Sequence, residues 1–121
     1  MSSVLTVDDS ASIRQAIRIA LTAEGHSITE AANGAEGLQK ADAGGFELII
    51  TDLNMPVMDG LTMIRELRKR PAQAGVPILF LTTESDAEIK QQAKAAGATG
   101  WLTKPFEPDQ LARIVKKVLT R

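Results

Sequence analysis

Short apolar runs alternate along the whole chain with stretches in which apolar residues recur every three or four positions. Consecutive apolar, β-branched residues are typical of strands buried on both faces, whereas the three-to-four spacing is typical of amphipathic helices. The predicted strands cover residues 4–7, 27–31, 48–51, 78–81 and 100–102, and a helical pattern follows each of them. Five strand–helix pairs in succession predict a parallel sheet with helices on both faces, because parallel strands need crossover connections.

Polar and small residues mark the ends of the predicted helices. Asp9 or Ser10 can cap the first helix and Asn33 the second, because their side-chain oxygens accept hydrogen bonds from free backbone N–H groups. Gly25 and Gly97 follow the last apolar positions of the first and fourth helices, where glycine commonly ends a helix. The last helix carries the clearest amphipathic stripe: Leu111, Ile114, Val115, Val118 and Leu119.

The composition predicts one soluble domain and excludes several classes of function. A chain of 121 residues has room for one domain of ordinary size. It contains no cysteine, which excludes disulfides and thiolate metal sites. The formal net charge of −1 provides no basic surface for nucleic acid or an anionic membrane. The first residues lack a signal-peptide pattern, and no apolar run reaches the roughly 20 residues of a membrane span, so we expect a cytoplasmic protein.

Acidic residues follow two of the predicted strands, and a lysine follows a third. Asp8 and Asp9 end the first apolar run, Asp52 ends the third, and Lys104 ends the fifth. The carboxyl ends of parallel strands open onto one crevice, so we expect these side chains to converge. Three acids and one amine at one point form a site for a divalent cation and a phosphoryl group.

Taken in order, these motifs resemble the receiver domain of two-component response regulators. The resemblance spans the chain from Val4 to the last helix. It rests on Asp8-Asp9-Ser10, Asp52, Met55-Pro56-x-Met58-Asp59-Gly60, Thr82-Thr83, Ala95-Ala96-Gly97-Ala98 and Lys104-Pro105-Phe106. It implies a doubly wound α/β fold of five βα units, flavodoxin-like or CheY-like, with strand order 2-1-3-4-5. It also implies a single receiver domain over residues 1–121, without an output domain.

The resemblance assigns the phosphoryl chemistry to the acidic cluster. Asp52 would be the phosphoacceptor, because an aspartyl carboxylate can act as a nucleophile and hold a phosphoryl group. Asp8, Asp9 and Asp52, together with the backbone carbonyl of Asn54, would bind Mg²⁺, for which Mn²⁺ can substitute. Asp8 would do so through a metal-bound water. Lys104 would pair with Asp52 and then with a phosphoryl oxygen.

Other residues would respond to phosphorylation. Thr82 and its neighbour Thr83 would supply a hydroxyl group that moves onto the phosphoryl group. Trp101 is either a core aromatic side chain or the aromatic switch, whose ring turns inward as the hydroxyl moves. By resemblance, Asn54 and Glu84 flank the path of the attacking water and tune the lifetime of the acyl phosphate.

Three further features can be interpreted as structural or as functional. The resemblance makes the bond between Lys104 and Pro105 a candidate cis peptide. Arg14 and Arg18 on the first helix, read as outward-facing, form a candidate docking face for the phosphodonor domain. Asp9, taken in isolation, could be no more than a helix cap, although a cap can also be a metal ligand.

These inferences predict a signalling phosphoacceptor and not an enzyme that turns over an external substrate. A stand-alone chemotaxis regulator would receive its phosphoryl group from a chemotaxis-type histidine kinase or its phosphotransfer domain. It would then bind a flagellar motor switch protein, or another target, through the face of the fourth helix, fifth strand and fifth helix. A phosphatase is a further candidate partner, nucleic acid and membrane are not, and we expect a monomer.

Other functions stay open at this stage. The domain could pass its phosphoryl group on within a phosphorelay, or drain a shared kinase as a phosphate sink. An aspartyl-nucleophile phosphatase is more remote, because such enzymes use a second acid two residues after the nucleophile, where this chain has Asn54. A flavin carrier would need a phosphate cradle after the first strand, where Asp8 and Asp9 repel phosphate.

Overall fold

Five parallel strands form one sheet in the computed structural model, which describes residues 2–53, 55, 57–83 and 87–119. The strands are β1 (Ser3–Val7), β2 (Ser27–Ala31), β3 (Leu48–Asp52), β4 (Ile78–Thr82) and β5 (Gly100–Thr103). The helices are α1 (Ala11–Thr22), α2 (Gly34–Ala43), α3 (Gly60–Arg68), α4 (Ala87–Ala96), α5 (Pro108–Leu119) and the short 3₁₀ helix η1 (Pro71–Gln73). The strand order is β2-β1-β3-β4-β5, which confirms the predicted fold.

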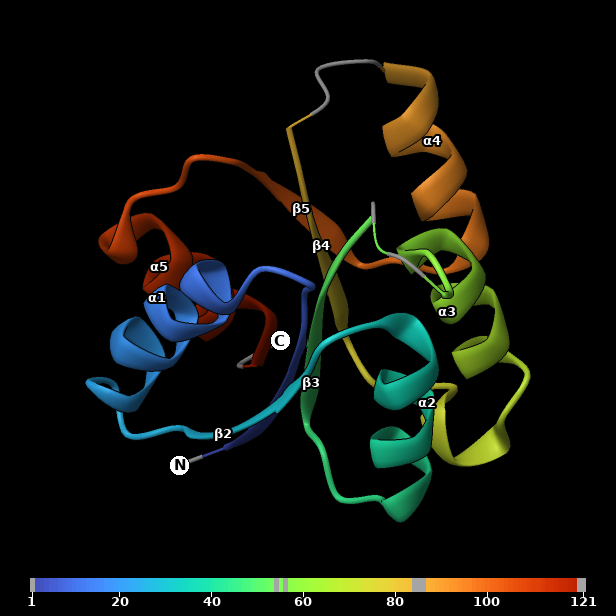
Figure 1. Cartoon of the computed structure of the whole chain (residues 1–121), viewed down its shortest axis with the longest axis horizontal. Coiled ribbons are helices and arrows are strands. Elements are labelled where there is room, and N and C mark those ends of the chain that lie inside the picture. Colours follow the sequence, from blue (N-terminus) through green and yellow to red (C-terminus); the bar gives the residue numbers. More distant parts are fainter. Residues whose placement is uncertain (1, 54, 56, 84–86, 120–121) are drawn as a thin grey trace.

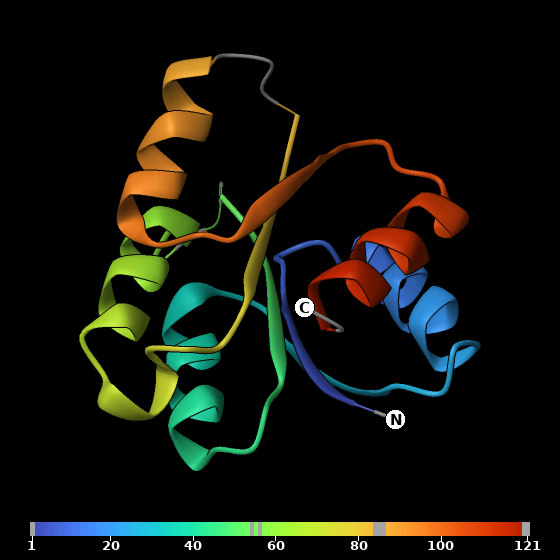
Figure 2. The same ribbon diagram turned by 180° about the vertical axis from the view of Figure 1, so that it is seen from behind.

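Helices cover both faces of the sheet (Figure 1). α1 and α5 pack together on one face, and α2, α3 and α4 lie side by side on the other, as the reverse view also shows (Figure 2). Because the strands are parallel, their carboxyl ends lie along one edge of the sheet, where ligands bind in folds of this kind. Within the described part of the chain, no helix is both long and apolar enough to cross a membrane.

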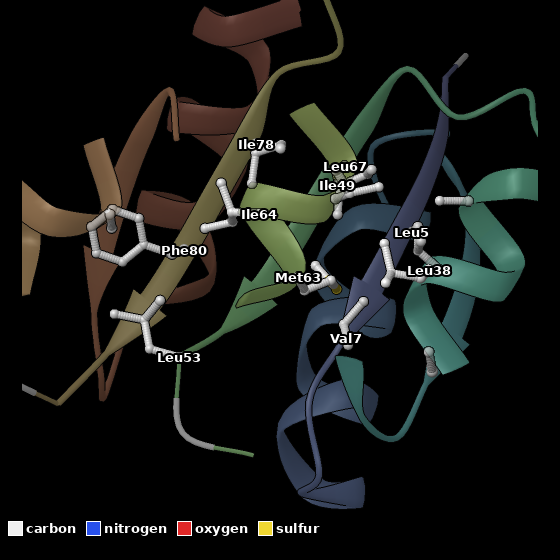
Figure 3. Packing of buried hydrophobic residues seen from close by; sticks show 13 residues of the cluster. Leu5, Val7, Leu38, Ile49, Leu53, Met63, Ile64, Leu67, Ile78 and Phe80 are labelled. Atoms are coloured by element: carbon white, nitrogen blue, oxygen red, sulfur yellow. The ribbon is translucent and has the colours of Figure 1, made fainter. Parts of the chain in front are cut away.

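Alternate side chains of the strands fill two apolar layers, one on each face of the sheet. Toward α2, α3 and α4 the strands contribute Leu5, Val7, Ile49, Ile78 and Phe80 (Figure 3). Toward α1 and α5 they contribute Val4, Leu48, Ile50, Leu79, Leu81 and Leu102. A one-residue slip of β1, β3 or β4 would exchange the side chains of the two layers and disrupt the close packing of both, which fixes the register. The register in turn fixes where the residues after each strand lie.

Capping residues mark the ends of the helices, as predicted. The Ser10 hydroxyl accepts a hydrogen bond from the Ile13 N–H at 3.3 Å, and the Asn33 side chain accepts one from the Glu36 N–H at 2.9 Å. Each of these bonds satisfies a backbone donor that the first turn of a helix leaves free. Gly97 follows α4 with φ of +120°, a conformation that L-residues rarely adopt.

The segment between α3 and β4 is more than a plain loop. It contains η1, and the buried side chain of Gln73 donates a hydrogen bond to the Ala41 carbonyl at the end of α2, at 2.9 Å. The partner lies 32 residues away in the sequence, so no local pattern indicates this contact.

Candidate functional site

The residues that follow β1 and end β3 meet at the carboxyl edge of the sheet. β1 and β3 are neighbours in register, with Val7 opposite Thr51, so the next residues in each strand lie side by side. Carboxylate oxygens of Asp8, Asp9 and Asp52 all lie within 4.8 Å of one another. The expected convergence of three acids is therefore present in the structure.

Lys104 reaches this acidic cluster from the end of β5. Its Nζ lies 3.0 Å from Asp8 Oδ2 and 3.3 Å from Asp52 Oδ2. The resemblance implied a pair with Asp52, and the structure adds Asp8 as the nearer partner. One ammonium group thus bridges two carboxylates and offsets part of their mutual repulsion.

Burial and the neighbouring charges together set the protonation of Asp8 and Lys104. Asp8 is only 1% exposed, and burial raises its pKa, although hydrogen bonds from the Ser10 N–H and from Lys104 oppose the rise. Burial lowers the pKa of Lys104, but the hydrogen bond to Asp8 and the charge of Asp52 outweigh it, so the net pKa is raised. The lysine therefore stays charged beside a carboxylate whose ionisation is costly.

The backbone that follows Asp52 shapes its surroundings. The Leu53 N–H donates to Asp52 Oδ1 at 2.8 Å, and Oδ2 faces the lysine. The Gly60 N–H donates to the Leu53 carbonyl at 3.0 Å, which brings the start of α3 close to β3. A Cβ atom on Gly60 would lie 2.1 Å from the Asp52 carbonyl oxygen, far inside contact distance. A glycine is thus required for α3 to begin against the backbone of the candidate acceptor.

The other predicted site residues lie at the same edge or outside the described residues. Thr82 ends β4 beside β3 and is buried, whereas Thr83 is exposed. The Thr82 carbonyl accepts a hydrogen bond from the Lys104 N–H at 2.9 Å, and the peptide bond from Lys104 to Pro105 is cis. Asn54 and Glu84 lie outside the described residues.

Trp101 lies at the surface of β5 with 37% of its area exposed, so the reading as a core aromatic is wrong. The Trp101 ring lies beside the ring of Phe80, with centroids 6.1 Å apart and planes tilted by 30°. The Nζ atoms of Lys90 and Lys94 lie 5.1 Å and 5.8 Å from the Trp101 ring centroid, within range of cation–π attraction. These contacts are made in the outward orientation of the ring.

Arg14 points toward the acidic cluster, which corrects the expectation of an outward docking residue. Its Nη1 donates to the Asp8 carbonyl oxygen at 2.6 Å, and its Nε donates to Glu30 Oε1 at 3.1 Å. Arg18 stays half-exposed, with its Nη1 3.2 Å from Glu30 Oε2. Helical spacing places Arg14 beside the apolar stripe, and its two partners, Glu30 on β2 and the Asp8 carbonyl, hold it inward.

The carboxylate cluster has the chemistry of a site for a small divalent cation. Mg²⁺ prefers oxygen ligands, and ligands of one octahedral ion at about 2.1 Å lie roughly 3–4 Å from one another. One oxygen from each of Asp8, Asp9 and Asp52, all within 4.8 Å of one another, would have to approach by at most about 2 Å to share such an ion. Asp9 is exposed, so the cluster is open to solvent on that side.

Comparison with known sequences identifies the family. Residues 4–116 match the response regulator receiver domain. The chain is 36% identical over 120 residues to the transcriptional regulatory protein ResD of Bacillus subtilis, a match that covers 99% of this chain and 49% of ResD. The chain spans about half the length of the curated relatives it matches.

Solved structures agree with this match. The chemotaxis protein CheY4 of Vibrio cholerae is 47% identical with a TM-score of 0.94, over 98% of both chains. The receiver domain of the sensor histidine kinase PA1611 of Pseudomonas aeruginosa is 28% identical with a TM-score of 0.92, over 99% of this chain and 98% of that chain. That receiver domain carries a magnesium ion in its active-site cleft. Receiver domains are signalling phosphoacceptors of two-component systems and generally not enzymes in the usual sense. This chain belongs to the response regulator receiver domain family.

Proposed function

We propose that this protein accepts a phosphoryl group on Asp52 from a histidine kinase, with Mg²⁺ held by Asp8, Asp9 and Asp52. The observation that carries the proposal is the cluster of three carboxylates, two of which are bridged by Lys104. A lone aspartate at a strand end would be an ordinary turn residue. An acid cluster that can hold a metal ion beside a largely buried ammonium group is suited to neutralising the charge of a transferred phosphoryl group.

The chemical step is a displacement at phosphorus. A carboxylate oxygen of Asp52 attacks the phosphorus of a phosphohistidine, the P–O bond forms, and the electron pair of the broken P–N bond returns to the imidazole. Mg²⁺, or Mn²⁺ as another oxygen-preferring ion, would be held by Asp8, Asp9 and Asp52 and would supply positive charge that offsets the charge of the phosphoryl oxygens. Lys104, now near Asp52 Oδ2, donates to a phosphoryl oxygen.

The remaining predicted residues couple the acceptor to a response. Thr82 supplies a hydroxyl to the phosphoryl group, with Thr83 beside it at the end of β4. Trp101 then leaves its outward orientation, so that phosphorylation shifts the population of two conformers. Asn54 and Glu84 tune the hydrolysis of the acyl phosphate.

For the output, we favour a chemotaxis messenger that binds a flagellar motor switch protein through the face of α4, β5 and α5. The support is the 47% identity to CheY4, which extends over 98% of both chains. The identity to ResD is lower and covers only about half of that regulator. The similarity to a receiver domain of a sensor histidine kinase favours, as the second candidate, a phosphorelay or phosphate-sink role.

Intact-mass spectrometry after incubation with acetyl phosphate tests the phosphoacceptor. We expect addition of one phosphoryl group that requires Mg²⁺ or Mn²⁺, is abolished by EDTA and is absent from Asp52→Asn. Asp109→Asn, which removes an acid from the first turn of α5, is the matched control and should be modified like the parent. Modification that persists in Asp52→Asn, or none even with a phosphorylated histidine kinase as donor, would overturn the proposal.

A second experiment separates the two outputs. Phosphorylated protein is mixed either with a motor switch protein or with an unphosphorylated histidine phosphotransfer domain. Phosphorylation-dependent binding to the switch protein supports the messenger. Rapid return of the phosphoryl group to histidine, without binding to the switch protein, supports the relay.

A further inference from the structure

Arg14 connects the acidic cluster to the edge strand β2. Its guanidinium group donates through Nη1 to the Asp8 carbonyl oxygen at 2.6 Å and through Nε to Glu30 Oε1 at 3.1 Å. The side chain is 19% exposed, so these bonds are largely shielded from water. A short, charge-assisted hydrogen bond to a carbonyl is stronger than one between neutral groups.

The Asp8 carbonyl belongs to the peptide bond that leads into Asp9. The orientation of this peptide plane, together with the φ angle of Asp9, sets the direction in which the Asp9 side chain leaves the backbone. The other groups of Asp8 are held as well, since its N–H donates to the Ala31 carbonyl at 3.1 Å and its Oδ1 accepts from the Ser10 N–H at 2.9 Å. Arg14 is the side chain that holds the carbonyl.

Asp9 depends on this backbone support. Its side chain is exposed, and among the described residues no hydrogen bond or ion pair restrains its carboxylate. The carboxylate nevertheless lies with those of Asp8 and Asp52, all within 4.8 Å. With no partner for its carboxylate among the described residues, Asp9 relies on its backbone to keep the side chain near the other two acids.

Glu30 in turn orients Arg14. One carboxylate oxygen of Glu30 pairs with Arg14, and the other pairs with Arg18 at 3.2 Å. The Glu30 carbonyl accepts a hydrogen bond from Lys40 on α2. β2 thus presents Glu30 at a fixed place, between the charged residues of α1 and the lysine of α2.

We propose that Arg14 is a positioning residue for the divalent-cation site, which it serves by fixing the Asp8–Asp9 peptide bond. The inference rests on the proposed function, since it names a support for the same metal site. The alternative is a purely structural tie between α1 and β2. The two differ in what Arg14 controls, because a structural tie affects unfolding, whereas a positioning residue affects metal affinity in the folded protein.

The experiment measures Mg²⁺ affinity by calorimetric titration of the parent, Arg14→Gln, Arg14→Lys and Arg18→Gln. Arg18→Gln is the matched control, because Arg18 lies on the same helix and pairs with the same glutamate without a hydrogen bond to Asp8. We expect Arg14→Gln to weaken Mg²⁺ binding about 10-fold, as loss of a group that orients metal ligands typically does. Arg18→Gln should stay within about 2-fold of the parent. Arg14→Lys, which keeps one donor, should recover part of the loss.

Each result has a definite meaning. Equal Mg²⁺ affinity of the parent and Arg14→Gln, with the parent phosphorylated normally, overturns the positioning role and leaves the proposed function intact. A parent that binds no Mg²⁺ overturns both. If Arg14→Gln does not fold, Glu30→Gln replaces it, because that change removes the negative charge that holds the guanidinium group and leaves Arg14 in place. Glu30→Gln should weaken Mg²⁺ binding more than Arg18→Gln, and equal affinities would contradict the inference.

Discussion

Replacing Lys104 by methionine should destabilise the metal-free protein, because it removes the cation between two buried carboxylates. The lysine is 14% exposed, and its Nζ lies 3.0 Å and 3.3 Å from Asp8 and Asp52. At an effective dielectric constant of about 20, each contact corresponds to roughly 5 kcal/mol of Coulomb attraction, of which desolvation of the charges cancels a large part.

Proton uptake limits the loss. The ordinary pKa of Asp8 is 3.8, which corresponds to a cost of about 4 kcal/mol for protonation at pH 7, and the burial that raises this pKa makes the cost smaller. We therefore expect Lys104→Met to lower the free energy of unfolding by about 3 kcal/mol at pH 7 in EDTA. In an Asp8→Asn background, one of the two partners is already gone, and the same change should cost about 1 kcal/mol.

Urea unfolding followed by far-UV circular dichroism measures both values. Lys69→Met is the control: Lys69 also lies 3.0 Å from a carboxylate, that of Glu66, but it is 71% exposed. Screening by solvent should reduce the loss in this control to under about 0.5 kcal/mol. The reasoning is refuted if Lys104→Met costs the same in both backgrounds, or no more than Lys69→Met.

Four other predictions concern single residues. Because burial raises the pKa of Asp8, its ionised form lowers the free energy of unfolding at pH values above that pKa. In EDTA, Asp8→Asn should therefore be more stable than the parent at pH 7, and the difference should shrink as the pH falls toward 4. A difference in urea midpoint that stays constant with pH would contradict this. Asp9→Asn should raise the melting temperature in EDTA and reduce the Mg²⁺-induced rise, as scanning calorimetry can show; an equal rise in variant and parent refutes it. Thr6→Val should stabilise the fold by about 1 kcal/mol in urea, because the buried Thr6 hydroxyl has no partner among the described residues; a loss of stability would imply an unseen one. Val57→Asn should also raise the free energy of unfolding by about 1 kcal/mol, because Val57 is β-branched, has φ of +69° and is 84% exposed. An unchanged free energy of unfolding would mean that valine is not strained in this left-handed conformation.

Much of the fold and part of the site follow from the sequence. The apolar runs predict all five strands, and Ser10 and Asn33 predict two helix starts, because capping depends on residues only three positions apart. The acids after β1 and β3 converge because neighbouring parallel strands end at the same edge. The strand order itself came from the family resemblance, since periodicity does not say which strands are neighbours.

Only the tertiary structure decides which charged groups of the acidic cluster pair with one another. Lys104 and Asp8 are 96 residues apart, and the choice between Asp8 and Asp52 as nearer partner depends on how β5 ends relative to β1. Arg14 turns inward because its guanidinium group pairs with Glu30 on β2, although the position of Arg14 on the helix alone predicted an outward side chain. The sequence by itself thus determined the elements and the chemical groups at their ends, through interactions between near neighbours. The pairing of those groups depends on contacts between distant segments, which exist only once the sheet has formed.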